Sequence, residues 1–168
     1  MAEVSASVVI GAPLAEVWDF YFRPQAWPAW VDQFGNVEAS EGYPEQGGTL
    51  RWRSGPAGRG TVSECVIEHE PRTTHRVEFD DPESEGELEV SFAIETGEEI
   101  ASTRVTQRMT YRLKGGGPFG PLTDILFIRS QVRRSLERSL ARLRAEIEAS
   151  ERSSAPVDPG ATDTPGYL

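Results

Sequence analysis

The sequence contains few of the residues on which several protein classes depend. One of its 168 residues is cysteine, Cys65, so no disulfide can form within the chain. Histidine occurs only as His69 and His75. No apolar run approaches the ~18 residues of a membrane-spanning helix, and the first residues lack the basic and apolar regions of a signal peptide. We therefore expect a cytoplasmic protein with no disulfide scaffold and no integral membrane segment.

Basic charge is also scarce. The formal net charge is −10 and the pI is near 4.7, which argues against nucleic-acid binding because that function needs a clustered basic surface. Ten acidic residues and no Lys or Arg lie between Glu78 and Glu99. Arginines gather instead between Arg129 and Arg144, either as a solvated helix face or as a docking stripe for another protein. Sixteen arginines against one lysine suggest a GC-rich bacterial source.

The longest periodic pattern lies between Pro121 and Ala149. Apolar residues recur there at steps of three and four, which places them on one face of an α-helix: Ile125, Ile128, Val132, Leu136, Leu140, Leu143 and Ile147. Gly120-Pro121 is a typical helix start, and Asp124 suits the positive end of the helix dipole. No other segment predicts a helix of matching length, so this apolar face must pack against a sheet.

The segments before this helix predict strands. After a first strand at Val4–Ile10 and two short helices, period-two alternation begins at Thr49–Ser54 and is clearest at 104–113. In the segment 61–70, apolar residues occur at both odd and even positions and would lie on both faces of a regular strand. A bulge or a covered outer face is therefore required. The residues after Ser150 are mainly Ser, Pro, Thr, Asp and Gly, and we expect 151–168 to form a disordered tail.

The expected order is one strand, two helices, about six antiparallel strands and one long helix. This is an α+β domain over residues 1–150. A helix about 10 Å wide cannot cover seven strands lying flat, so the sheet must curve around it. Curved sheets that hold a single helix tend to leave an internal cavity, and such cavities bind small molecules.

Several short segments resemble a known family over about residues 3–149. They are Ala12–Trp18 after the first strand, Trp27–Trp30, Gly47–Thr49, Val66–Pro71, Thr103–Thr106 and the final helix. The chain resembles the START-like helix-grip superfamily, also called SRPBCC, and within it the polyketide cyclase/dehydrase-like branch. The resemblance implies a curved seven-stranded sheet around a C-terminal helix, with a hydrophobic ligand cavity between them. It implies no single activity, because the fold serves lipid carriers, receptors, cyclases and co-chaperones.

Three hypotheses of function follow. The first is binding of a small hydrophobic molecule, aromatic, polyketide-like or lipidic, by a monomer or weak homodimer. The second is a cyclase or dehydratase that uses general acid–base chemistry without metal or cofactor. The third is a protein-interaction module that uses the arginine-rich helix face. An iron site of two histidines and a carboxylate is rejected, because His69 and His75 are predicted to lie on opposite faces of the sheet.

Three residues are candidates for catalysis. His75 is expected on the same face of its strand as Val77 and Phe79. A two-residue turn at Pro71-Arg72 would place Glu68 opposite His75 as its partner. Glu64 shares the parity of Val66, so it points either into the cavity or, in another register, into solvent. Tyr111 lies on the clearest strand. Each also has a purely structural interpretation as an exposed or satisfied polar group.

The remaining candidates are predicted to contact a ligand because they share the inner parity of a strand or the apolar face of a helix. They are Trp30, Phe34, Leu50, Trp52, Val66, Val77, Phe79, Val90, Phe92, Gln107, Met109, Ile125, Ile128 and Val132. We predict no metal ligands, because Cys65 and His69 lie about 13 Å apart along an extended strand. The hinge Gly115–Pro118 before the long helix predicts the cavity entrance at that end.

Overall fold

The computed structural model describes residues 1–96, 101–114 and 122–154, with side chains from 126 to 153 in the last segment. Its strands are β1 (Ala2–Ile10), β2 (Phe34–Glu41), β3 (Thr49–Ser54), β4 (Thr61–Glu70), β5 (Thr74–Asp80), β6 (Ser84–Glu95) and β7 (Ser102–Leu113). Its helices are α1 (Leu14–Tyr21), the 3-10 turn η1 (Pro24–Ala26), α2 (Trp27–Trp30) and α3 (Leu122–Ser154). None of these described helices is long and apolar enough to cross a membrane.

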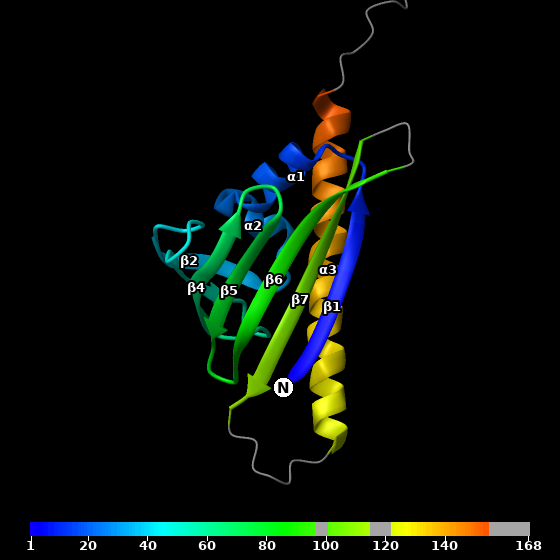
Figure 1. Cartoon of the computed structure of the whole chain (residues 1–168). Helices are drawn as coiled ribbons and strands as arrows, with labels where there is room; N and C mark the ends of the chain where they lie inside the picture. Colours follow the sequence, from blue (N-terminus) through cyan, green and yellow to red (C-terminus); the bar gives the residue numbers. More distant parts are fainter. Residues whose placement is uncertain (97–100, 115–121, 155–168) are drawn as a thin grey trace, which may run out of the picture.

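The seven strands form one antiparallel sheet in the order β1-β7-β6-β5-β4-β3-β2. Only the β1–β7 pair joins strands that are distant in the sequence. Figure 1 shows α3 running alongside β1, with α1 and α2 near its upper part. The predicted α+β helix-grip architecture, a seven-stranded antiparallel sheet against one long helix, is confirmed.

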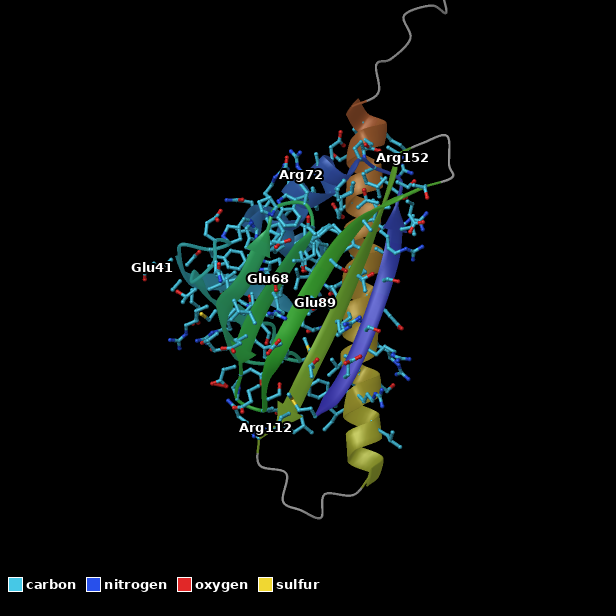
Figure 2. All side chains as sticks on the ribbon, in the orientation of Figure 1. Glu41, Glu68, Arg72, Glu89, Arg112 and Arg152 are labelled. Carbon is cyan, nitrogen blue, oxygen red and sulfur yellow. The ribbon has the colours of Figure 1, made fainter. Side chains whose placement is uncertain are left out.

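Alternation along the strands separates the core from the solvent, as predicted. On β3, Leu50 and Trp52 are buried while Arg51 and Arg53 are exposed. On the outer face, Glu89 of β6 lies directly opposite Arg108 of β7. Figure 2 shows the labelled Glu68 and Glu89 on the face of the sheet that is turned away from α3. The outer face is therefore lined with charges that pair across strands, which adds modest stability.

A bulge in β4 explains the mixed parity of this strand. Val62 and Val66 are buried and Cys65 is exposed, so the first part of β4 points Glu64 inward. The pairing with β5 then shifts between Val66 and Glu68. Of the two explanations that the sequence left open, the bulge is the correct one.

The β4–β5 loop corrects the predicted partner of His75. The loop is one residue longer than the predicted turn, since Glu70 pairs with Thr74 and Arg72 adopts a left-handed φ of 64°. Glu68 therefore lies opposite Arg76, on the outer face, and its nearest ion pair is with that arginine at 3.2 Å. His69 lies opposite His75. The expected Glu68–His75 pair and the placement of the two histidines on opposite faces are both wrong.

Helix α3 has 33 residues and is about 50 Å long. Its predicted apolar face is buried at Leu136, Leu140, Leu143 and Ile147, and half-buried at Ile128 and Val132. The helix continues to Ser154, so the predicted tail begins too early: Glu151 and Arg152 favour helix. The side chain of Ile125, the expected entrance at 115–118 and the tail from residue 155 lie outside the described residues.

Candidate functional site

A cavity of about 120 Å³ lies between the sheet, the short helices and α3. Ten residues of the predicted site line it: Trp30, Phe34, Leu50, Trp52, Glu64, His75, Val77, Val90, Gln107 and Met109. Further lining side chains come from α1, α2 and the loop after β2, and include Tyr21, Trp27 and Tyr43. The walls are therefore mainly aromatic and apolar, with a few polar groups, which is the usual composition of a small-molecule site.

The other predicted residues lie outside this cavity. Val66 and Phe92 are buried in the core, where the Phe92 ring packs edge-on against Trp18 at 4.9 Å. Phe79 is covered by the guanidinium of Arg59 at 4.3 Å. Tyr111, Ile128 and Val132 line a separate groove of about 690 Å³ beside α3. Met109 and Leu136 line both hollows, so the groove adjoins the cavity.

The three candidate catalytic residues are therefore divided between two places. Glu64 and His75 line the cavity, whereas Tyr111 lies in the groove. Burial raises the pKa of Tyr111, and the charge of Arg129 acts in the opposite direction. The structure brings together Glu64 and His75 but not Tyr111. Tyr111 pairs with Gly86 near the N-terminal end of β6.

Gln107 is held in one orientation by α1. Its Nε2 donates a hydrogen bond of 2.8 Å to the hydroxyl of Tyr21, and both groups are buried. Burial raises the pKa of Tyr21 well above its ordinary value despite this bond, so the phenol stays protonated. The Oε1 atom of Gln107 has no hydrogen-bond partner among the described residues. Since the amide nitrogen is occupied, the free oxygen is left as an acceptor beside the cavity.

Glu64 reaches the cavity from the inward part of β4. One of its carboxylate oxygens accepts a 2.9 Å hydrogen bond from the indole N–H of Trp52, on the neighbouring strand. Burial raises the pKa of Glu64, while this bond and the charge of Arg59 act against the increase. Arg59 is also bound to Asp81, which accepts a 2.7 Å bond from its Nε atom. Burial therefore favours the protonated form of Glu64.

His75 is 4% exposed and packs among aromatic rings. The ring centroids of Phe22 and Tyr43 lie 4.8 and 5.4 Å from its own. Its Nδ1 atom lies 2.9 Å from Nδ1 of His69, while its Nε2 atom has no partner among the described residues. Burial lowers the pKa of His75 to about 3, and the charge of His69 acts in the same direction. The imidazole is therefore neutral at ordinary pH.

Eight residues that line this cavity were not among the candidates from the sequence, including Tyr21, Trp27 and Tyr43, and neither was His69, which contacts His75. Tyr21 and Trp27 were visible as apolar positions of short helices, but their faces are fixed only by packing against the sheet. Tyr43 lies in an irregular loop with no periodicity to orient it. The His69–His75 contact also removes the reason given for rejecting an iron site. Within the described residues, no three His, Cys, Asp or Glu side chains gather to hold a metal ion.

The arginine-rich face of α3 is partly occupied by Asp32. The Asp32 side chain is 2% exposed and lies 2.7 Å from Arg138 and 3.4 Å from Arg142. Ser135 donates a further bond of 2.9 Å. Burial alone would raise the pKa of Asp32, but the bonds from Arg138 and Ser135 and the two guanidinium charges hold it below its ordinary value. Two of these arginines therefore fasten α3 to the segment before β2.

Known proteins share this architecture. The family model described as polyketide cyclase / dehydrase and lipid transport matches residues 1–148. The ZhuI aromatase/cyclase from Streptomyces sp. R1128 is 18% identical and has a TM-score of 0.71, with 93% of this chain and 99% of that chain covered. The protein TTHA0849 from Thermus thermophilus is 22% identical with a TM-score of 0.65 and coverages of 89% and 99%.

A third similar structure is DynU16, described as a putative protein in the dynemicin biosynthetic locus. It is 21% identical with a TM-score of 0.56, and 88% of this chain and 48% of that chain are covered. No curated protein matches the chain. At these identities the three structures support the fold, whereas the family model covers nearly the whole described chain. The chain belongs to the polyketide cyclase/dehydrase and lipid transport family.

Proposed function

We propose that this protein binds a small aromatic or polyketide-like molecule in the cavity beneath α3. One observation carries the proposal: three buried polar atoms without partners among the described residues, Trp30 Nε1, His75 Nε2 and Gln107 Oε1, belong to side chains that line this one cavity. Each unpaired buried polar group costs about 1–3 kcal/mol. A ligand with hydroxyl or carbonyl groups on an apolar ring would satisfy all three, since they comprise a donor, an acceptor and an imidazole nitrogen.

The size of the cavity defines how such a ligand enters. At about 120 Å³ it is smaller than the ~300–1,000 Å³ typical of sites for drug-sized ligands. A single ring fits this space, and the rest of a longer ligand extends into the adjoining groove beside Tyr111, Ile128 and Val132. This arrangement gives a role to Tyr111, Ile128 and Val132, which were predicted site residues but lie outside the cavity.

Quenching of tryptophan fluorescence tests the proposal, because Trp27, Trp30 and Trp52 all line the cavity. We expect 2-naphthol to bind more tightly than naphthalene, which has the same rings without the hydroxyl group. Trp30→Phe removes the indole nitrogen, and Gln107→Met removes both the oxygen and the nitrogen of the amide group at similar volume. Each should weaken 2-naphthol binding about tenfold and leave naphthalene binding nearly unchanged.

Arg51→Ala is the matched control, because Arg51 lies on the exposed face of β3. Equal binding of both compounds by the wild-type protein, or unchanged binding of 2-naphthol by both cavity variants, would refute the proposal. Native mass spectrometry of protein purified from its own host then identifies the natural ligand by its mass.

A second candidate function is cyclase or dehydratase activity, favoured by the opposite effects of burial on Glu64 and His75. Burial favours a protonated carboxyl group and a neutral imidazole, which are the forms needed in a general acid and a general base. In dehydration of a β-hydroxy ketone, His75 Nε2 would take the proton from the carbon between the two oxygen-bearing carbons. Glu64 would donate a proton to the hydroxyl group, which leaves as water while the carbon–carbon double bond forms.

Dehydration of 4-hydroxy-4-phenylbutan-2-one tests this reaction, because its conjugated product absorbs in the near ultraviolet. Glu64→Gln and His75→Gln should each lower the rate at least about 100-fold. Glu68→Gln is the control, since Glu68 lies on the outer face opposite Arg76. Tight ligand binding without turnover by the wild-type protein would leave the binding function and eliminate the enzymatic one.

A further inference from the structure

The two histidines of the chain form a direct pair across the β4–β5 ladder. Their Nδ1 atoms lie 2.9 Å apart and their rings are nearly perpendicular, at 85°. Trp18 of α1 and Phe22, the residue that follows this helix, contact the His69 ring at centroid distances of 5.3 and 5.4 Å. His75 is buried, whereas His69 is partly exposed. The pair therefore connects the cavity with the protein surface.

A contact between two Nδ1 atoms at this distance needs one proton between them. If both nitrogens carried a proton the hydrogens would collide, and if neither did the lone pairs would repel. When His69 accepts, His75 carries its proton on Nδ1, so its Nε2 atom is a bare acceptor beside the cavity. When His69 donates, the proton of neutral His75 lies on Nε2, which then becomes a donor. The protonation of one ring thus fixes the tautomer of the other.

We infer that His69 is a positioning residue that sets the tautomer of His75 and relays protons between the cavity and solvent. In the acceptor state, His75 Nε2 takes a proton from the bound molecule while the Nδ1 proton of His75 moves to Nδ1 of His69. His75 is neutral before and after the step, and the positive charge arises on His69. Return of a proton from His69 reverses the sequence, so no oxidant or other reactant is needed.

The surroundings of the two rings favour a positive charge on His69 over one on His75. Burial opposes a charge on His75 and holds its pKa at about 3, so an isolated imidazole there would be a weak base. His69 bears the charge at lower cost because it is partly exposed. The ionisable groups that line the cavity with His75 are Tyr21, Tyr43, Glu64 and Arg59. Burial keeps both tyrosines protonated, so neither competes for the proton near neutral pH.

Nitrogen NMR of the ligand-free protein tests the coupling without any assumption about activity. Protonation of His69 turns its Nδ1 atom into a donor, so His75 must move its proton from Nδ1 to Nε2. We expect the ¹⁵N signal of His75 Nε2 to change from that of an unprotonated to that of a protonated ring nitrogen. The midpoint of this change should equal that of His69. A constant His75 signal while His69 titrates, or no titration of His69, would overturn the inference.

Two variants provide the matched comparison. His69→Phe keeps an aromatic ring beside Trp18 and Phe22 but has no nitrogen, so the His75 signal should lose its dependence on pH. His69→Gln retains a group that can donate or accept, and it serves if the first variant fails to fold. A pH-dependent tautomer change of His75 that persists in a folded variant would contradict the coupling.

The relay in turnover, unlike the tautomer coupling, rests on the enzymatic function proposed above. If the protein is a dehydratase, His69→Phe should lower the rate about tenfold with little effect on KM, and His69→Gln should recover part of it. An unchanged rate would reject the relay in turnover. Binding of 2-naphthol reports on the cavity independently, because Trp30 and Gln107 do not contact His69 through any hydrogen bond in the described structure.

Discussion

At the scale of single residues, burial shifts the pKa values of two side chains in the cavity, Glu64 and His75, in opposite directions. It raises the pKa of Glu64 and lowers the pKa of His75, and in both cases it favours the neutral form. The cost of burying a charge is thereby avoided without an ion pair. Glu64 accepts one hydrogen bond from Trp52, and His75 contacts His69 through Nδ1 alone. Each side chain therefore keeps a polar atom that can contact a ligand.

His75 should make the stability of the protein depend on pH. Its pKa is about 3 in the folded state and near 6.5 when unfolded, so the unfolded chain binds more protons between these values. The free energy of unfolding should therefore increase as the pH rises from 4.5 to 6.5, by about 2 kcal/mol from this residue. Urea unfolding at several pH values measures it.

His75→Gln should remove this part of the pH dependence, and the difference between the two proteins isolates it from other groups. Asp32 does not interfere, because its pKa lies below 3.8 and its contribution is lost only at lower pH. Parallel stability curves for the wild-type protein and His75→Gln between pH 4.5 and 6.5 would contradict the assignment.

At the scale of elements, the contact between Asp32 and α3 joins segments that are about a hundred residues apart in sequence. The carboxylate is almost fully buried, whereas Arg138 and Arg142 are half-exposed. The backbone N–H of Asp32 also donates a 2.9 Å hydrogen bond to the hydroxyl oxygen of Ser139 on α3. This segment leads from α2 into β2, and so it fixes α2, with Trp30 in the cavity wall, against the long helix.

Asp32→Ala should destabilise the protein by about 2–3 kcal/mol, because it removes several charge-assisted hydrogen bonds at a buried position. Arg138→Ala should cost about 1 kcal/mol or less, since the arginine is half-exposed and Arg142 and Ser135 remain bound to Asp32. Urea unfolding at pH 7 compares them. Equal losses would show that the ion pair with Arg138 accounts for the whole effect.

The close approach of the β6 and β7 backbones at Gly86 can also be tested by mutation. A Cβ atom at Gly86 would lie 2.7 Å from the Cα of Tyr111 and would also collide with the carbonyl oxygen of Thr110. Both obstacles are backbone, so the strands must separate. Gly86→Ala should destabilise by about 2 kcal/mol or more in urea unfolding.

Gly11→Ala is the control for this substitution. Its nearest neighbour would be the carboxylate of Glu148 at 3.5 Å, which is an ordinary contact. We expect its stability to stay within about 1 kcal/mol of the wild type. A Gly86→Ala protein as stable as Gly11→Ala would mean that β6 and β7 approach less closely than described.

At the scale of the whole molecule, the cavity is surrounded by the sheet, α1, α2 and α3, so its walls exist only in the folded state. A ligand that binds there must stabilise the fold by mass action. At a free concentration 100 times its Kd, 2-naphthol should add about 2.7 kcal/mol to the free energy of unfolding, which differential scanning calorimetry detects as a higher Tm. Gln107→Met should show a smaller increase at the same concentration, and an unchanged wild-type Tm would contradict binding in the cavity.

The sequence by itself determined the fold. Period-two alternation on β3 and β7 and the three-four spacing on α3 are local patterns, and they identify which face of each element is buried. Pairing the apolar face of the sheet with that of the helix then leaves few architectures. For the same reason most residues predicted to line the cavity do line it.

The tertiary structure alone decided the chemistry within the cavity. One additional residue in the β4–β5 loop and one bulge place His69 opposite His75 and move Glu68 to the outer face. Tyr21 and Tyr43 reach the site from a helix and a loop whose orientation no periodicity fixes. A shift of a single residue reverses the face of every following side chain in a strand. Strand patterns therefore predicted the walls of the cavity, while register and loop geometry determined which polar groups meet there.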